Sequence, residues 1–121
     1  MNNWVLLQHK IERIDDVETH YDFLIERGKD CLTWKIFEIP KINGPSVEII
    51  KQVNHRLIWL YREKYNLSDG RGLVQRMDYG TYCVVGDFLD ENEFSLILNG
   101  KIFNGILKKK FNSCQLMSKI N

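Results

Sequence analysis

The amino-acid sequence predicts a mostly β domain, a small antiparallel β-barrel with one or two short helices or loops. Short runs rich in β-branched and aromatic residues recur along the chain, and such runs are typical of strands. Turn residues separate these runs, and Asn99-Gly100 lies between two of them as a strong hairpin signal. Successive short strands with tight turns favour a closed or half-closed barrel.

The N-terminal half contains three expected strands, at residues 4–10, 20–26 and 31–39. Residues 11–19 are polar and carry two aspartates, so we expect a loop there. A glycine-containing turn at 27–30 joins the second and third strands, which predicts a hairpin. The segment 40–45 begins and ends with proline and should interrupt the strands.

The middle of the chain, residues 46–61, fits two patterns. Apolar residues including Val47, Ile50 and Val53 recur at helical spacing, and Ser46 is suited to cap a helix. The same stretch is also β-branched and aromatic enough for strands. Periodicity slightly favours a helix, whereas the family resemblance given below favours a strand near His55.

The C-terminal half returns to the strand pattern. The expected strands are 73–77, 81–85, 94–98 and 102–109, and residues 116–121 form either a final strand or a loose end. The 121 residues suffice for one domain with a core, so we expect a single domain over 1–121, with 112–121 as a possible loose tail.

Composition narrows the classes of function. The net charge of +1 gives no strong overall field, so any nucleic-acid binding must come from a local patch. Three cysteines, none at metal-ligand spacing, predict reduced thiols in a cytoplasmic protein. The first apolar run is too short for a signal peptide, and no run approaches the roughly 18 residues of a membrane span. We therefore expect a cytoplasmic monomer without membrane contact.

Three histidines, His9, His20 and His55, are the candidates for chemistry. On a strand, His20 and Asp22 share one face, whereas on a helix they would diverge by about 200°. With His9 from a neighbouring strand they would form a two-histidine, one-carboxylate metal site with open positions. The alternative is a purely structural His–Asp hydrogen bond.

Other polar residues allow two interpretations each. His55 could donate a proton to a leaving oxygen or hold a phosphate, or it could be an ordinary half-buried histidine. The turn 68–72 combines glycines with Arg71 and could present N–H groups to an anion, although such turns are more often only turns. Arg76 adds positive charge nearby.

Several motifs occur in the order found in one known family. These are Val5-Leu6-Leu7-Gln8-His9, His20-Tyr21-Asp22-Phe23 with Glu26, Leu32-Thr33-Trp34, Asn54-His55-Arg56-Leu57, Gly72-Leu73-Val74, Asp78-Tyr79-Gly80-Thr81-Tyr82, and Leu98-Asn99-Gly100 with Gly105. Through them the chain resembles the 3′-phosphoesterase domain of bacterial DNA ligase D. It is similar above all to the stand-alone DNA polymerase/ligase N-terminal domain proteins.

The resemblance implies a β-barrel phosphoesterase, a hydrolase of DNA repair that trims 3′ ends of nucleic acids. It implies a divalent metal, manganese or alternatively zinc, held by His9, His20 and Asp22, with His55 contacting the reacting phosphate. Gln8 and Glu26 would contact the ligand side chains without binding the metal themselves. A DNA-repair protein is a further expected partner.

The chain also departs from the family pattern. Leu24 stands where family members carry an arginine, Trp59 where they carry a tyrosine, and Val47 near the position of another arginine. Arg56, Arg71 or Arg76 would have to replace these cations. The alternative function is therefore a non-catalytic barrel that binds nucleic-acid ends or a protein and has lost the phosphate-clamping arginines.

Overall fold

The computed structural model describes residues 2–87 and 89–119 and confirms the mostly β class. Its elements are β1 (Asn3–Glu12), β2 (Val17–Arg27), β3 (Asp30–Ile36), β4 (Val47–Glu48), β5 (Ile50–Arg56), the 3₁₀ turn η1 (Leu57–Leu60), β6 (Lys64–Leu67), β7 (Gly72–Val84), β8 (Glu93–Asn99), β9 (Asn104–Lys110) and β10 (Ser113–Met117). No helix of the described residues has the length and apolar character needed to cross a membrane.

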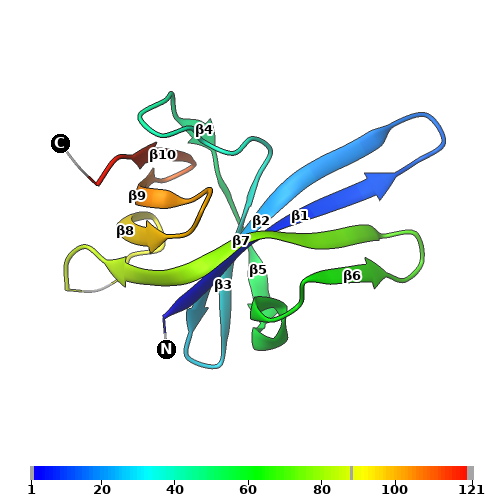
Figure 1. Ribbon diagram of the computed structural model, residues 1–121, viewed down its shortest axis with the longest axis horizontal. Coiled ribbons are helices and arrows are strands. Elements are labelled where there is room, and N and C mark those ends of the chain that lie inside the picture. The colour runs from blue at the N-terminus through cyan, green and yellow to red at the C-terminus, as the bar shows by residue number, and fades with distance from the viewer. Residues whose placement is uncertain (1, 88, 120–121) are drawn as a thin grey trace.

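All named strands pair antiparallel in one strongly twisted sheet of order β4-β10-β9-β8-β7-β1-β2-β3-β5, with β6 also paired to β7 (Figure 1). The end strands β4 and β5 follow one another in the chain, separated only by Ile49. Within the described ranges, no ladder joins these two strands. The sheet therefore curls toward a barrel without closing.

The strand β1 is buried on both faces because it separates two apolar clusters. Trp4 and Leu6 belong to the larger cluster, which fills the space between the two halves of the curled sheet. Val5 and Leu7 belong to a smaller cluster, which η1 covers through Leu57 and Leu60. The candidate site lies on the face of this smaller cluster, beyond Leu7 along β1.

Several expected boundaries are corrected. The loop expected at 11–19 shrinks to 13–16, because β1 and β2 extend into it as a long hairpin (Figure 1). The strands expected at 73–77 and 81–85 form one continuous strand, β7. The third strand ends at Ile36 rather than at 39, and β6 is an additional strand. Residues 120–121 of the expected C-terminal strand or tail lie outside the described residues.

The helix favoured by periodicity over 46–61 is wrong. The segment forms β4, β5 and the single 3₁₀ turn η1, and the strand expected near His55 is present. Val53, one of the residues at helical spacing, is 82% exposed. The spacing therefore does not mark a buried stripe.

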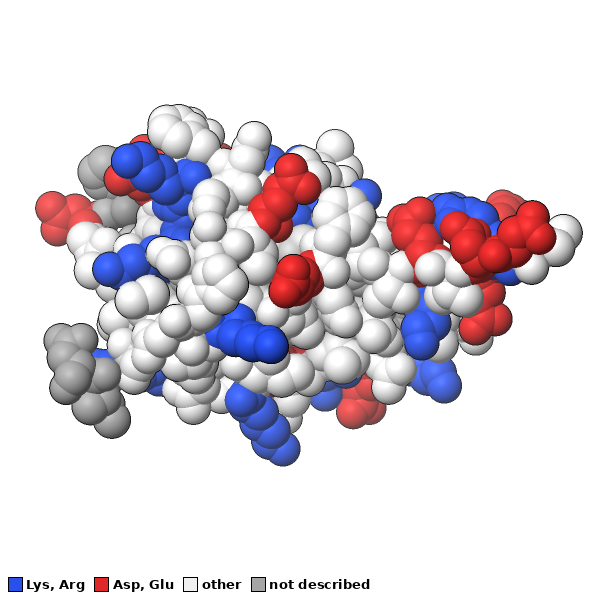
Figure 2. Space-filling model, turned by 90° about the horizontal axis from the view of Figure 1, so that it is seen from above, with Lys and Arg blue, Asp and Glu red and all other residues white. Residues whose placement is uncertain are grey.

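Figure 2 shows how the charged side chains are distributed over one face. Charged side chains, mostly acidic, gather at the end of the molecule where the β1–β2 hairpin turns. Elsewhere on this face, lysines and arginines are scattered singly. Any nucleic-acid interface on this face would rest on a few local cations.

Candidate metal centre

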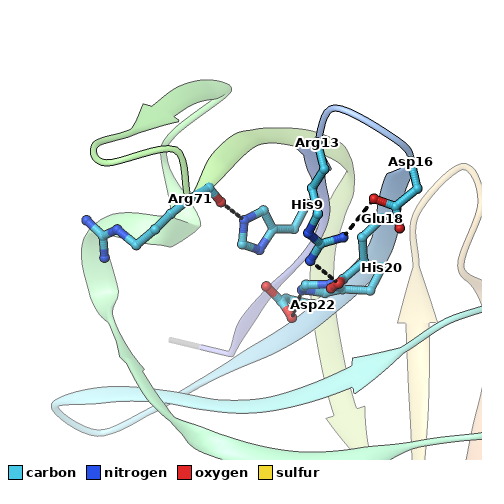
Figure 3. Close-up of polar contacts among 7 residues, drawn as sticks. All are labelled: His9, Arg13, Asp16, Glu18, His20, Asp22 and Arg71. Carbon is cyan, nitrogen blue, oxygen red and sulfur yellow. Dashed lines mark hydrogen bonds and ion pairs between the residues drawn. The ribbon is translucent and has the colours of Figure 1, made fainter.

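The register of the β1–β2 ladder brings the predicted ligands together. His9 pairs with His20, and Leu7 pairs with Asp22. Residues directly opposite in an antiparallel pair project from the same face, so the three side chains meet beyond Leu7 (Figure 3). Each residue offers one ligand atom, and all three atoms lie within 4.8 Å of one another.

These distances fit a shared cation. Two ligand atoms about 2.0–2.2 Å from the same ion lie at most about 4.4 Å apart. The Asp22 Oδ1 atom is 3.6 Å from His20 Nε2, within that limit. The three ligand atoms all lie within 4.8 Å of one another, so a bound ion would draw them only slightly closer. The donor set of two imidazoles and one carboxylate could hold a divalent metal ion.

One ring nitrogen of His9 contacts the main chain. The Nε2 atom lies 2.6 Å from the main-chain oxygen of Arg71. A carbonyl oxygen only accepts hydrogen bonds, so Nε2 must carry the proton in this contact. The lone pair of neutral His9 is then on Nδ1, which leaves Nδ1 as the nitrogen that could bind a cation.

His20 is the most deeply enclosed of the three histidines, with a side chain only 7% exposed. Its Nδ1 atom lies 3.3 Å from Glu18 Oε2, but the two are not aligned as a hydrogen bond. Burial lowers the pKa of His20, and the nearby charges of His9 and Lys35 lower it further against the opposing effect of Asp22. The neutral, metal-binding form is therefore favoured.

A cavity of about 220 Å³ opens beside this group. Its lining includes His9, Asp22, His55, Trp59 and Arg71. His55 reaches it from β5, where it pairs with Cys31 of the smaller apolar cluster. The His55 Nδ1 atom donates to the main-chain oxygen of Val53 at 3.1 Å, which leaves Nε2 for a ligand. The structure thus brings all three histidines to one region.

The three arginines proposed as phosphate contacts are placed differently. Arg71 lines the cavity, but its guanidinium donates to Ser68 and extends away from Asp22 (Figure 3). Arg76 lies 3.3 Å from Glu63 and stacks on Tyr79 at 4.2 Å. Arg56 is exposed at the end of β5. Among the described residues, neither Arg76 nor Arg56 lines the cavity.

The two residues expected to support the ligands stand apart from them. Gln8 follows Leu7 in β1, so it projects from the face opposite His9. The Glu26 carboxylate accepts hydrogen bonds from the main chain and side chain of Asn3 at 3.2 and 3.0 Å, four residues along β2 from Asp22. In these positions, neither residue supports His9, His20 or Asp22 directly.

Two neighbours of the ligands were missed by the sequence analysis. Glu18 contacts His20, and Lys35 pairs with Asp22 across the β2–β3 ladder. Glu18 was assigned to a loop, although the alternation Glu18-x-His20-x-Asp22 is a readable signal once the strand is extended. Lys35 had no signal, because only the strand register places it opposite Asp22.

No sequence model of a protein family and no curated protein matches this chain.

Proposed function

We propose that the protein is a metal-dependent phosphoesterase that acts on 3′ ends of nucleic acids. The observation that carries the proposal is the cavity of about 220 Å³ shared by His9, Asp22 and His55. It combines a possible cation site with a third histidine directed at the same space. The motif resemblance to the 3′-phosphoesterase domain supports the choice of a nucleic-acid 3′ phosphate as substrate.

His9, His20 and Asp22 would hold the cation, with manganese expected and zinc as the alternative. A bound divalent cation would polarise a phosphoryl oxygen and lower the pKa of a coordinated water. The ligand group lies in a partly enclosed site, since the His20 and Asp22 side chains are 7% and 12% exposed. Such enclosure strengthens electrostatic interactions with a developing charge.

His55 would complete the reaction as the acid. When water attacks the phosphorus atom, the bond to the sugar 3′ oxygen breaks and that oxygen needs a proton. Since Nδ1 of His55 already donates to Val53, protonated His55 would supply the proton from Nε2. General acid catalysis of this kind contributes about 10²–10⁴ in rate.

The cationic clamp on the phosphate would come from Lys35, which was not among the expected cations, together with Arg71, which was. Lys35 lies opposite Asp22 on the ladder, and its charge acts on His20. Arg71 lines the cavity and could turn toward a phosphate by releasing Ser68. Cations near the transferring group stabilise the charge that spreads over its oxygens.

One observation favours a second candidate, a non-catalytic barrel that binds nucleic-acid ends or a protein. The Arg76 guanidinium is held by Glu63 and Tyr79, and that of Arg71 by Ser68. Neither is poised on a phosphate in this arrangement. Both candidates belong to the same proposed setting, a cytoplasmic protein of nucleic-acid repair with a repair protein as a further partner.

The decisive experiment incubates the protein with a 3′-phosphate primer and a 3′-ribonucleotide primer, with and without Mn²⁺ or Zn²⁺. Metal binding is measured in parallel by calorimetry. We expect metal-dependent product, loss of both binding and product in Asp22→Asn, and loss of product alone in His55→Ala. Primer binding without product would favour the non-catalytic barrel, and a chain that binds no metal would contradict the metal centre itself.

A further inference from the structure

We propose that Glu18 is a positioning residue of the metal centre, and that Arg13 holds Glu18 in place. Glu18 would fix the His20 ring with its proton on Nδ1, which leaves Nε2 as the ligand nitrogen. The inference rests on the metal centre of the proposed function and deepens it. It names the support of one ligand and the nitrogen that binds.

Glu18 lies on β2, the strand that carries His20. It precedes His20 by two residues, so both side chains project from the same face of the strand. The Glu18 Oε2 atom lies 3.3 Å from His20 Nδ1, and Asp22 Oδ1 lies 3.6 Å from His20 Nε2 on the other side of the ring. The imidazole is therefore flanked by two carboxylates that have different tasks.

The neutral His20 ring carries its proton on one of two nitrogens. A carboxylate accepts hydrogen bonds and donates none when it is ionised. With a cation bound between His20 Nε2 and Asp22, the proton of the neutral ring would lie on Nδ1, the nitrogen that faces Glu18. His20 Nδ1 is buried and has no aligned hydrogen-bond partner. A small rotation of the ring or of the Glu18 side chain would align the pair. A carboxylate on the far nitrogen of a metal-bound histidine fixes both its tautomer and its orientation.

The Glu18 side chain is itself held by Arg13. Arg13 Nη2 donates to Glu18 Oε1 at 2.8 Å, and Arg13 Nη1 lies 3.4 Å from Asp16 Oδ1 (Figure 3). Because one oxygen of Glu18 is held by Arg13, the other is directed at His20.

Together with the His9 contact, this arrangement assigns a mixed set of ligand nitrogens. His9 would bind through Nδ1, because its Nε2 donates to Arg71. His20 would bind through Nε2, because its Nδ1 faces Glu18. Each ligand histidine thus has its own support, one from a main-chain oxygen and one from a carboxylate.

The test measures Zn²⁺ affinity by calorimetry in four variants of the full chain. Glu18→Ala should weaken binding by about 10–100-fold, the usual effect of removing such a support. Glu18→Gln keeps an accepting oxygen and should lose less, and Arg13→Met should weaken binding in the same direction. The matched control is Asp15→Asn, which removes one negative charge from the same hairpin turn without altering Glu18.

Nitrogen-detected NMR of the Zn²⁺-loaded protein provides the second readout, since the chain has only three histidines. We expect the His20 signals of a ring protonated on Nδ1 and metal-bound through Nε2, and we expect Glu18→Ala to disturb them. Glu18→Ala that matches Asp15→Asn in both affinity and His20 signals would overturn the proposal.

The two proposals fail separately. Metal binding and 3′-end hydrolysis that survive Glu18→Ala unchanged would remove only the positioning role. A Glu18-dependent metal site that hydrolyses no 3′ end would remove the phosphoesterase and leave the positioning role intact. A wild-type protein that binds neither Mn²⁺ nor Zn²⁺ would overturn both.

Discussion

The Nε2 atom of His9 and the main-chain oxygen of Arg71 lie 2.6 Å apart, although the residues are 62 positions apart in the chain. This contact ties a candidate metal ligand on β1 to the turn between β6 and β7. Because a main-chain oxygen makes the contact, the shape of the turn matters more than the Arg71 side chain. Gly70 in this turn and Gly72, the first residue of β7, allow that dependence to be tested.

Gly72→Ala should weaken metal binding by about 10–100-fold, as expected for a lost ligand support. Gly72 has φ +101°, and a Cβ there would lie 2.4 Å from the Lys10 oxygen, so the turn must shift. Gly70→Ala is the control, because Gly70 also has positive φ (+69°) but a Cβ there meets nothing within 4 Å. Equal metal affinities in the two variants, measured by calorimetry, would show that the turn does not position His9.

Lys35→Met should slow metal-dependent hydrolysis of a 3′-phosphate primer by on the order of 10-fold or more, the scale of losing one charge-stabilising group. Lys35 lies opposite Asp22 on the β2–β3 ladder, within electrostatic reach of His20. Arg76→Met is the matched control, since the Arg76 guanidinium is held by Glu63. A larger loss in Arg76→Met than in Lys35→Met would assign the clamp to Arg76 instead.

Asp78→Ala should destabilise the fold by at least about 3 kcal/mol, because a buried charged acceptor with several donors is lost. Asp78 is 4% exposed and accepts from the main-chain N–H groups of Tyr79, Lys101, Ile102 and Phe103 at 2.7–3.0 Å. It thereby fixes the turn between β8 and β9.

The control for this prediction is Asp90→Ala. Asp90 is exposed and its side chain accepts from the Asn92 N–H at 2.9 Å, so about 0.5–1.5 kcal/mol is expected. Urea denaturation of both variants gives the comparison. Similar midpoints for the two would contradict the role assigned to Asp78.

The three thiols should react at very different rates. Burial raises the pKa of Cys31 to about 12 and that of Cys114 to about 11, whereas Cys83 is exposed. The thiolate is the reactive form, and at pH 8 a thiol of pKa about 12 is ionised to about one part in 10⁴. A thiol reagent should therefore label one site rapidly in the folded protein and all three after unfolding. Rapid labelling of all three in the folded protein would contradict the burial of Cys31 and Cys114.

The β class and the core of the site were within reach of the sequence. The strand pattern around His20 and Asp22 could be read locally, because the two-residue period of a strand places both on one face. The turn residues at 27–30 and Asn99-Gly100 likewise act through local backbone preferences. Both hairpins are present, β2–β3 and β8–β9.

Local sequence patterns do not predict the register between two strands. The β1–β2 register sets His9 opposite His20, and sliding one strand by a single residue would turn His9 to the other face. In this register the pairing extends to Glu12 and Val17, so Glu18 lies on the strand, where it contacts His20. The helical spacing over 46–61 failed because burial, which the spacing was taken to represent, is decided by neighbours elsewhere in the chain.

Local sequence patterns therefore predict a mostly β chain with a histidine and a carboxylate on one strand face. The folded arrangement adds His9 and His55 to them, sets Lys35 opposite Asp22, and pairs Arg76 with Glu63. The difference comes from the range over which each kind of interaction acts. Strand alternation and turns depend on adjacent residues, whereas a metal site depends on the register and curvature of strands far apart in the chain.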